Sequence, residues 1–380
     1  MMALVSLRAL FGFGFFAFLM IGALQAIYGP AFTALGTRFG VGRADIGLIA
    51  SAHFLGSMLG IMASGAVLLH SSLRRLLRGG AALLALGLAT VAFAPSWPVA
   101  LLGALVGGLG FGGVSVTFNV SFARLGERSA GALNLVNAMF GLGSVLAPLL
   151  VVFLGGAVWP YVLLALASLV LLLGAGRVPQ LPEAVTAAGD RPVDGRLLAL
   201  FGLLFVTYVG VEAGLGSWMT THLQTNGFSD AAAWTSAFWL TVTVGRLLGA
   251  PLSQRVPLPG LVTCAALLAA LVLPLAATVA APLAYLVAGL AIAPIFASSL
   301  AWFSRVLPSR FTPLVLACGG LGGTLVPALL GILVESFGTA VLPYAFAVTA
   351  LGVVAVACAV QGALRRVSRM LCSSLPHELH

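Results

Sequence analysis

The sequence contains no lysine and few charged residues of any kind. Of its 380 residues, 7% are charged and 61% are hydrophobic, whereas a soluble domain carries about 25% charged residues. This deficit excludes a soluble protein and places the chain in a lipid bilayer. All 18 basic residues are arginine, which we interpret as the codon bias of a GC-rich, prokaryotic genome.

The sequence also lacks the motifs of enzymes and of metal sites. The four cysteines, Cys264, Cys318, Cys358 and Cys372, form neither a CxxC pair nor a metal-ligand spacing. There is no Walker motif, no HExxH motif, no acid pair and no GxSxG elbow. We therefore expect a protein that is not an enzyme and that uses no cofactor or metal.

Long apolar runs are what the sequence has in abundance. A run of about 20 apolar residues can cross a membrane as a helix, whereas a β-barrel would show short alternating segments. The runs predict an all-α membrane protein with twelve spans, near residues 6–29, 45–68, 76–94, 97–122, 130–154, 158–176, 197–222, 230–252, 260–280, 282–304, 312–335 and 341–363.

A long polar segment divides these spans into six and six. The expected organisation is a six-helix bundle at 1–176, an interhalf linker at 177–196, a second six-helix bundle at 197–364 and a tail at 365–380. With both termini in the cytoplasm, nearly all arginines face inward, and only Arg38 and Arg43 lie outside, while Arg246 lies in the eighth span. This positive-inside asymmetry predicts a cytoplasmic linker and tail, and explains the net charge of +9 without a nucleic-acid partner.

One phrase occurs twice, once in each half. GLGSVLAPLL occupies residues 141–150 in the fifth span, and GLGGTLVPAL occupies residues 320–329 in the eleventh. Glycine lets membrane helices approach closely, and proline kinks a membrane helix when neighbours satisfy the freed carbonyl. We expect the halves to be pseudo-symmetric repeats, with structural roles for Gly141, Gly143, Pro148 and Pro327.

The six-linker-six plan resembles the major facilitator superfamily. The segment GAVLLHSSLRR (65–75) is similar to the loop motif of that superfamily, with Arg74 and Arg75 present but Leu69 or His70 in place of the acid. Its counterpart GRLLGAPLSQR (245–255) is better formed. The resemblance implies a transporter that works by alternating access. It implies structural or gating roles for Arg74 and Arg75 and, in the counterpart, for Gly245, Arg246, Gly249 and Arg255.

Two further phrases resemble the fucose and glucose/galactose symporter-like branch. YVGVEAGLGSWMTTHL (208–223) looks like a signature of that branch, and LNLVNAMFGLGSVLAPLL (133–150) carries Asn137 where histidine is common. The resemblance implies sugar transport. Symporters of the branch can carry acids in spans 1 and 4, where this chain offers Gln25 and Asn119.

Ionisable residues at membrane depth are candidates for function. Glu212 lies midway along the seventh span, and either couples protons, accepts hydrogen bonds from substrate hydroxyls, or pairs structurally with a neighbour such as Arg246. His53 lies in the middle of the second span. An imidazole titrates near physiological pH, so His53 is a second candidate for proton coupling; the alternative is a histidine packed and hydrogen-bonded between helices.

Neutral polar side chains complete the candidate site. Asn134 and Asn137 are three residues apart and share one helix face, and Tyr208 precedes Glu212 by one turn. Facing a cavity, such groups would bind hydroxyls; facing a neighbouring helix, they would hold helices together. The residues expected to bind substrate are Gln25, Asn119, Asn134, Asn137, Tyr208 and Glu212.

Together these features predict a monomeric secondary transporter of the inner membrane. Its partners would be the lipid bilayer, protons as candidate coupling ion, and a small neutral hydroxylated solute, which we expect to be a monosaccharide. One alternative is a multidrug exporter of the same fold. Such exporters have a motif in the fifth span, and this chain matches it in part, at Gly143, Ala147 and Pro148. Another is a receptor built on a transporter scaffold, which would need a large extramembrane domain that this sequence does not show.

Overall fold

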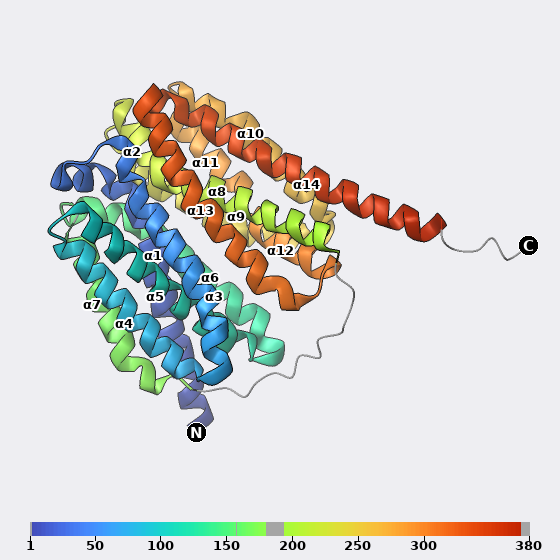
Figure 1. Ribbon diagram of the computed structural model, residues 1–380, viewed down its shortest axis with the longest axis horizontal. Helices are drawn as coiled ribbons and strands as arrows, with labels where there is room; N and C mark the ends of the chain where they lie inside the picture. Colours follow the sequence, from blue (N-terminus) through green and yellow to red (C-terminus); the bar gives the residue numbers. More distant parts are fainter. Residues whose placement is uncertain (1, 157, 180–193, 374–380) are drawn as a thin grey trace, which may run out of the picture.

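The computed structural model describes residues 2–156, 158–179 and 194–373, and all regular structure within them is helical (Figure 1). The first group of helices is α1 (Met2–Phe39), α2 (Arg43–Ile46), α3 (Leu48–His70), α4 (Leu73–Phe93), α5 (Trp97–Ala123), α6 (Ser129–Phe153) and α7 (Trp159–Gly174). The second is α8 (Gly195–Thr225), α9 (Ala231–Arg255), α10 (Leu258–Val272), α11 (Ala281–Ile292), α12 (Ile295–Val306), α13 (Thr312–Phe337) and α14 (Leu342–Ser373).

These helices correspond in order to the twelve predicted spans. Eleven stretches of the described residues are long and apolar enough to cross a membrane, and the remaining span is α9, a helix of 25 residues that contains Arg246. The all-α class is confirmed. The predicted linker, residues 177–196, lies largely outside the described residues; helical structure continues to Arg177 and resumes at Gly195.

Two predicted spans differ from the structure at prolines. The first span does not end before Pro30, because α1 continues through this proline to Phe39. The tenth span, predicted as one helix, is broken into α11 and α12 at Ala293 and Pro294. Proline removes a backbone donor and crowds the preceding turn, so a proline within an apolar run does not by itself decide whether the helix ends.

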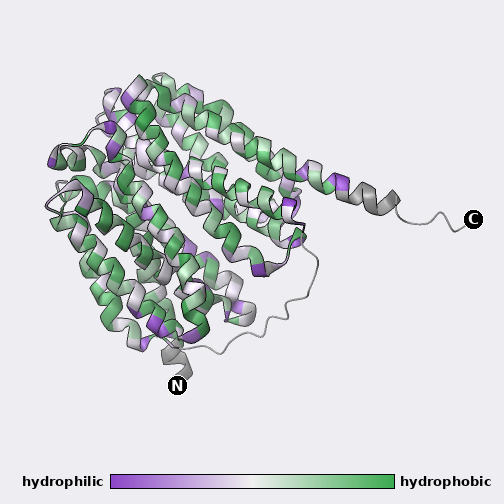
Figure 2. Cartoon of the chain, viewed as in Figure 1, coloured by the Kyte–Doolittle hydropathy of each residue, from purple (hydrophilic) through white to green (hydrophobic). Residues whose placement is uncertain are grey.

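The outer surface is that of a membrane protein. Apolar residues cover most of the length of the helices, and polar residues gather near helix ends and in loops (Figure 2). Large apolar side chains such as Phe93, Phe153 and Leu173 are well exposed. A soluble monomer rarely exposes so much apolar surface, whereas lipid covers it in a bilayer.

The helices form two groups that meet along four helix pairs. Helices α1 to α7 pack mainly on one another, and so do α8 to α14. In Figure 1 most of the first group lies toward the lower left, in blue to green, and the second group lies toward the upper right, in yellow-green to red. Contacts between the groups run through α1 with α8, α6 with α9, and α2 and α3 with α13.

The repeated phrase lies where helices cross most closely. A Cβ atom on Gly143 would overlap the carbonyl oxygen of Leu19 in α1, and one on Gly322 would overlap the carbonyl oxygen of Val206 in α8. In both halves, therefore, the second glycine of GLG allows the fifth membrane helix to cross the first at backbone distance.

The first glycine of GLG serves the contact between the halves. A Cβ atom on Gly141 would overlap Thr243 of α9, and one on Gly320 would lie 2.5 Å from the Cβ of Met58 in α3. The two repeats thus make the same pair of contacts, one within a half and one across to the other half. Pro148 lies inside α6 and Pro327 inside α13, the fifth membrane helix of each half.

At one end of the bundle the halves are joined by polar and aromatic contacts that we call the gate. Its residues are Thr33, Arg43, Trp218, Gln224, Pro327 and Glu335. The Trp218 Nε1 donates to the Pro327 carbonyl at 2.9 Å, the Arg43 amide donates to the Glu335 carboxylate at 3.0 Å, and Thr33 donates to Gln224 at 3.0 Å. Trp218 is fully buried and meets Phe32 of α1 edge to face.

Candidate functional site

Exposed amides on α6 mark where the halves separate. Asn134, Asn137, Gly141 and Pro148 follow one another at spacings of three, four and seven residues, so they share one face of the helix. At Gly141 this face is packed against α9. At Asn134 and Asn137, further from the gate, the same face is exposed. These amides therefore face the space between the halves, on the side away from the gate.

Gln25 and Glu212 are equivalent residues of the two halves. In the first half, Gly143 packs on the backbone of Ala23, and Gln25 lies two residues after Ala23. In the second half, Gly322 packs on the backbone of Gly210, and Glu212 lies two residues after Gly210. Both also lie about one turn before the crossing of α1 and α8, where a Cβ on Gly29 would overlap the carbonyl oxygen of Gly216. Since α1 and α8 run in the same direction, the two side chains lie at the same depth from the gate.

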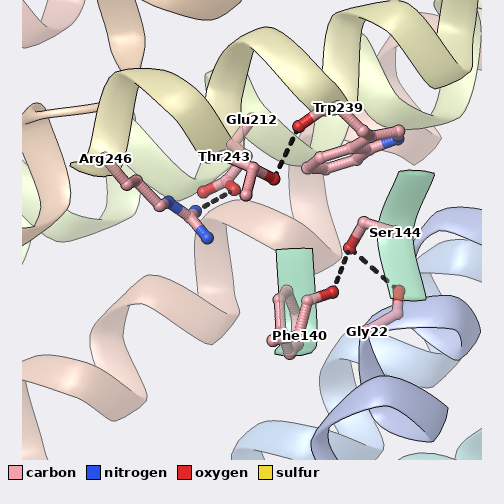
Figure 3. Close-up of polar contacts among 7 residues, drawn as sticks. All are labelled: Gly22, Phe140, Ser144, Glu212, Trp239, Thr243 and Arg246. Atoms are coloured by element: carbon pink, nitrogen blue, oxygen red, sulfur yellow. Dashed lines mark hydrogen bonds and ion pairs between the residues drawn. The ribbon is translucent and has the colours of Figure 1, made fainter. Parts of the chain in front are cut away.

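Glu212 is held in an ion pair. Its carboxylate accepts a hydrogen bond of 2.5 Å from the Arg246 guanidinium (Figure 3), and the side chains are 6% and 28% exposed, respectively. The predicted structural partner is therefore the one that the fold supplies. Because Arg246 is partly exposed, the pair borders open space rather than lying in a closed core.

Arg246 also lies beside the contact between the halves. It follows Thr243 by one turn on α9, and Thr243 packs against Gly141 of α6. Asn137 lies one turn before Gly141 on α6, and Arg246 lies one turn after Thr243 on α9. Because the two helices run in opposite directions, Asn137 and Arg246 lie at the same depth in the bundle. Figure 3 also shows the contact of α6 with α1, where Ser144 donates to the carbonyls of Gly22 and Phe140.

Tyr208 and Asn119 differ in whether their polar groups are hydrogen-bonded. Tyr208 is 1% exposed; its hydroxyl lies near the Glu212–Arg246 pair but has no hydrogen-bond partner among the described residues. Asn119 is half-buried on α5, and its amide donates to the carbonyl and hydroxyl of Ser115 in its own helix. Asn137 likewise donates to the carbonyl of Leu133.

His53 lies deep inside the first half. It is 1% exposed and is in ring contact with Tyr28, Phe54 and Phe111. Neither ring nitrogen has a hydrogen-bond partner among the described residues. His53 is therefore packed between helices, and no residue that the structure describes forms a hydrogen bond with its ring.

The remaining predicted residues serve helix ends and crossings. The Arg74 guanidinium donates to the Val178 carbonyl at 3.3 Å, which ties α4 to the end of the first half, whereas Arg75 and Arg255 are exposed. Cβ atoms on Gly245 and Gly249 would crowd Ala293 and Pro294, so these glycines let α9 approach the break between α11 and α12.

Sequence reasoning did not single out the gate. Trp218 bonds to Pro327 and packs on Phe32 there, yet a tryptophan in a membrane span is equally consistent with a membrane-interface position. The signal that could have found it is the pair of glycines beside it, since a Cβ on Gly47 would overlap the Pro327 carbonyl oxygen and one on Gly331 would crowd the Arg43 carbonyl oxygen and the Trp218 ring. No group of three His, Cys, Asp or Glu side chains within the described ranges could hold a metal ion.

Twelve membrane helices in two repeated groups of six, joined at one end by the gate residues, are the architecture of a membrane transporter. The chain belongs to the Major Facilitator Superfamily, whose sequence profile matches residues 14–316. The fold and its two pseudo-symmetric six-helix bundles are therefore confirmed, and the protein is a transporter of small solutes rather than an enzyme.

Solved transporters share this fold at low sequence identity. XylE from E. coli, a xylose transporter in a partially occluded inward-open conformation, has a TM-score of 0.76 and 13% identity, covering 92% of this chain and 98% of that chain. A variant of the nucleoside transporter NupG has a TM-score of 0.74 and 17% identity, covering 93% and 98%. A D-xylose-proton symporter has a TM-score of 0.77 and 14% identity, covering 92% and 96%. No curated protein matches the chain by sequence.

Proposed function

We propose that the chain is a secondary transporter that moves a small neutral polar solute, a monosaccharide, across the membrane by alternating access. The observation that carries this proposal is the charge of the interior. Glu212 is the one buried acidic side chain in the part of the chain the structure describes, and Arg246 neutralises it. A site without net charge and with several amides suits hydroxyl groups better than an ion.

The proposed binding residues surround one level of the bundle. Gln25 and Glu212 lie at the same depth on α1 and α8, and Asn137 lies level with Arg246 on the opposing half. Asn134 and Tyr208 lie one turn further from the gate, and Asn119 adds an amide from α5. An amide or a carboxylate that accepts from a sugar hydroxyl gains about 0.5–1.5 kcal/mol net for a neutral hydrogen bond and more for a charged one.

We further propose that transport is coupled to protons through Glu212 or His53. Glu212 is the stronger candidate because it borders the space between the halves, whereas His53 lies behind the gate. The bundles at 1–176 and 197–364 would rock about the site as units. The arginine asymmetry supports a cytoplasmic position for both termini in the inner membrane of a prokaryote. The protein would act as a monomer, because all the proposed binding residues belong to one chain.

The experiment is a binding screen followed by a flux measurement. Purified protein is tested by thermal shift against monosaccharides, nucleosides, charged metabolites and apolar drugs. Every stabilising compound is then tested for counterflow, the exchange of labelled for unlabelled solute across proteoliposomes. Exchange of a monosaccharide supports the proposal. Exchange confined to apolar drugs would favour the exporter of the same fold, and exchange of charged metabolites would refute a neutral site.

A further inference from the structure

Three polar side chains meet inside the first half, behind the contact with the second half. Tyr28 of α1, His53 of α3 and Tyr161 of α7 are each at most 1% exposed. The ring centroid of Tyr28 lies 5.2 Å from that of His53 and 6.0 Å from that of Tyr161. We call these residues the Tyr–His–Tyr cluster.

The cluster contains four buried polar atoms without a partner among the described residues. They are the Tyr28 hydroxyl, both ring nitrogens of His53 and the Tyr161 hydroxyl. Buried polar atoms in native proteins are almost always bonded to protein or to ordered water, because an orphaned group costs free energy. Four orphans on three touching side chains are therefore a feature that requires a bonding partner.

The second half contains the same residue types in a satisfied arrangement. The Tyr285 hydroxyl lies 3.0 Å from Nδ1 of His222, and both side chains are buried. A direct bond thus satisfies tyrosine and histidine in one half, while in the other half the same groups face each other without bonding.

The surroundings restrict what the partner can be. The packed neighbours of His53 are Phe54 and Phe111, and α5, which carries Phe111, has no ionisable side chain over Trp97–Ala123. On α1, Arg38 is bonded to the carbonyls of Val91 and Ala94. A cation would need a carboxylate and an anion would need a basic group. A neutral imidazole and two phenols offer both donors and acceptors, which a water molecule matches.

We propose that Tyr28, His53 and Tyr161 form a buried water-binding site in the first half. Water bonded to the four atoms ties α1, α3 and α7 together, as conserved internal waters do elsewhere. The site lies directly behind the contact between the halves. Tyr28 precedes Gly29, which packs on α8, and His53 precedes Phe54, against which Gly323 of α13 packs.

The test depends on the sign of a change in melting temperature. In a hydrated site, Tyr28→Phe and Tyr161→Phe each remove a bond and leave other groups unsatisfied, so each should lower the melting temperature of the full-length protein in detergent by about 2 °C or more. In a dry site the same changes remove an orphaned hydroxyl, and the melting temperature should stay unchanged or rise. An unchanged or raised value in either variant overturns the proposal.

Two matched variants calibrate this measurement. Tyr285→Phe breaks the direct bond to His222 and should lower the melting temperature. Tyr344 is 55% exposed, so Tyr344→Phe should leave it unchanged. The difference in melting temperature between these two controls sets the size of shift that is counted as a loss of stability in Tyr28→Phe and Tyr161→Phe.

A second measurement detects the water itself. Protein with ¹⁵N-labelled histidine, reconstituted in lipid, is analysed by solid-state NMR for magnetisation transfer between water and imidazole. The His53 resonance is assigned by its loss in His53→Gln. Transfer from water to His53 in the parent, weakened in the Tyr28→Phe/Tyr161→Phe double variant, is expected. A His53 signal without transfer from water would contradict the site.

Discussion

The two halves of the molecule repeat their helix crossings but not their polar chemistry. Gly143 and Gly322 bring the fifth and first membrane helices of each half together at backbone distance. Gly143 packs on Ala23 and Gly322 packs on Gly210. Two residues after each of these contacts, the first half carries Gln25 and the second carries Glu212, which is bonded to Arg246. The comparison shows that close packing demands the same residue type in both repeats, whereas the interior of the site holds a neutral amide on one side and an ion pair on the other.

The largest expected effect comes from filling the repeated crossings. Gly143→Val and Gly322→Val would each force backbone atoms apart, with a loss of stability of about 3 kcal/mol or more. Thermal unfolding and recovery of monodisperse protein measure this loss. Gly131→Ala is the control on α6, because a Cβ there meets nothing within 4 Å. If one half tolerates valine while the other does not, the two crossings are not equivalent.

The ion pair should respond unequally to loss of its two partners. Arg246→Met leaves the buried carboxylate of Glu212 without its counter-charge and should cost about 3–5 kcal/mol. Glu212→Gln should cost less, because the Arg246 side chain is 28% exposed against 6% for Glu212 and can be hydrated. The double variant should recover part of the stability lost in Arg246→Met. Equal losses in the two single variants would argue against a pair that borders open space.

Weakening the gate should shift the balance between conformations by a smaller amount. Trp218→Phe keeps an aromatic ring but removes the donor to Pro327, a loss of about 1 kcal/mol. Oxidative cross-linking of Thr33→Cys with Gln224→Cys, with Cys264, Cys318, Cys358 and Cys372 replaced by alanine, reports closure. Cross-linking should slow in Trp218→Phe.

The control for this experiment is Trp159→Phe, since the Trp159 side chain is 63% exposed whereas that of Trp218 is fully buried. Equal cross-linking rates in the parent, Trp218→Phe and Trp159→Phe would mean that the indole bond does not hold the gate closed.

The smallest effects are expected from single amides of the site. Gln25→Ala should weaken binding of a transported solute by about 0.5–1.5 kcal/mol. Asn119→Ala and Asn137→Ala should have less effect, because these amides already donate to their own helices. Isothermal titration measures the affinities. Gln361→Ala, which removes an amide bonded between α14 and α10, should leave affinity unchanged; a larger effect there than at Gln25 would place the site elsewhere.

Much of this architecture could be predicted from the sequence because lipid imposes a simple length rule on apolar helices. The spans, their order and the importance of the GLG glycines follow from that rule and from the repeat. The extension of α1 through Pro30 and the break at Pro294 could not be predicted, since both depend on which neighbours pack beside the proline.

The candidate site was predictable only in part, for a similar reason. Composition singles out Glu212 as a deep acid and names Arg246 as an available partner, but the pairing depends on how α8 and α9 pack. The Tyr–His–Tyr cluster was not predictable, because Tyr28, His53 and Tyr161 come from three helices whose relative rotation the sequence does not specify.

Gradient-driven uptake of labelled monosaccharide into proteoliposomes, compared between the parent and Glu212→Gln, tests the central proposal most directly. Glutamine keeps the shape of the side chain but cannot titrate. The parent should accumulate solute when the outside is acidic, and Glu212→Gln should lose this accumulation while retaining exchange of solute across the membrane. Accumulation by Glu212→Gln with the pH dependence of the parent would remove Glu212 from the coupling, and a parent that neither exchanges nor accumulates any monosaccharide would contradict the proposed function.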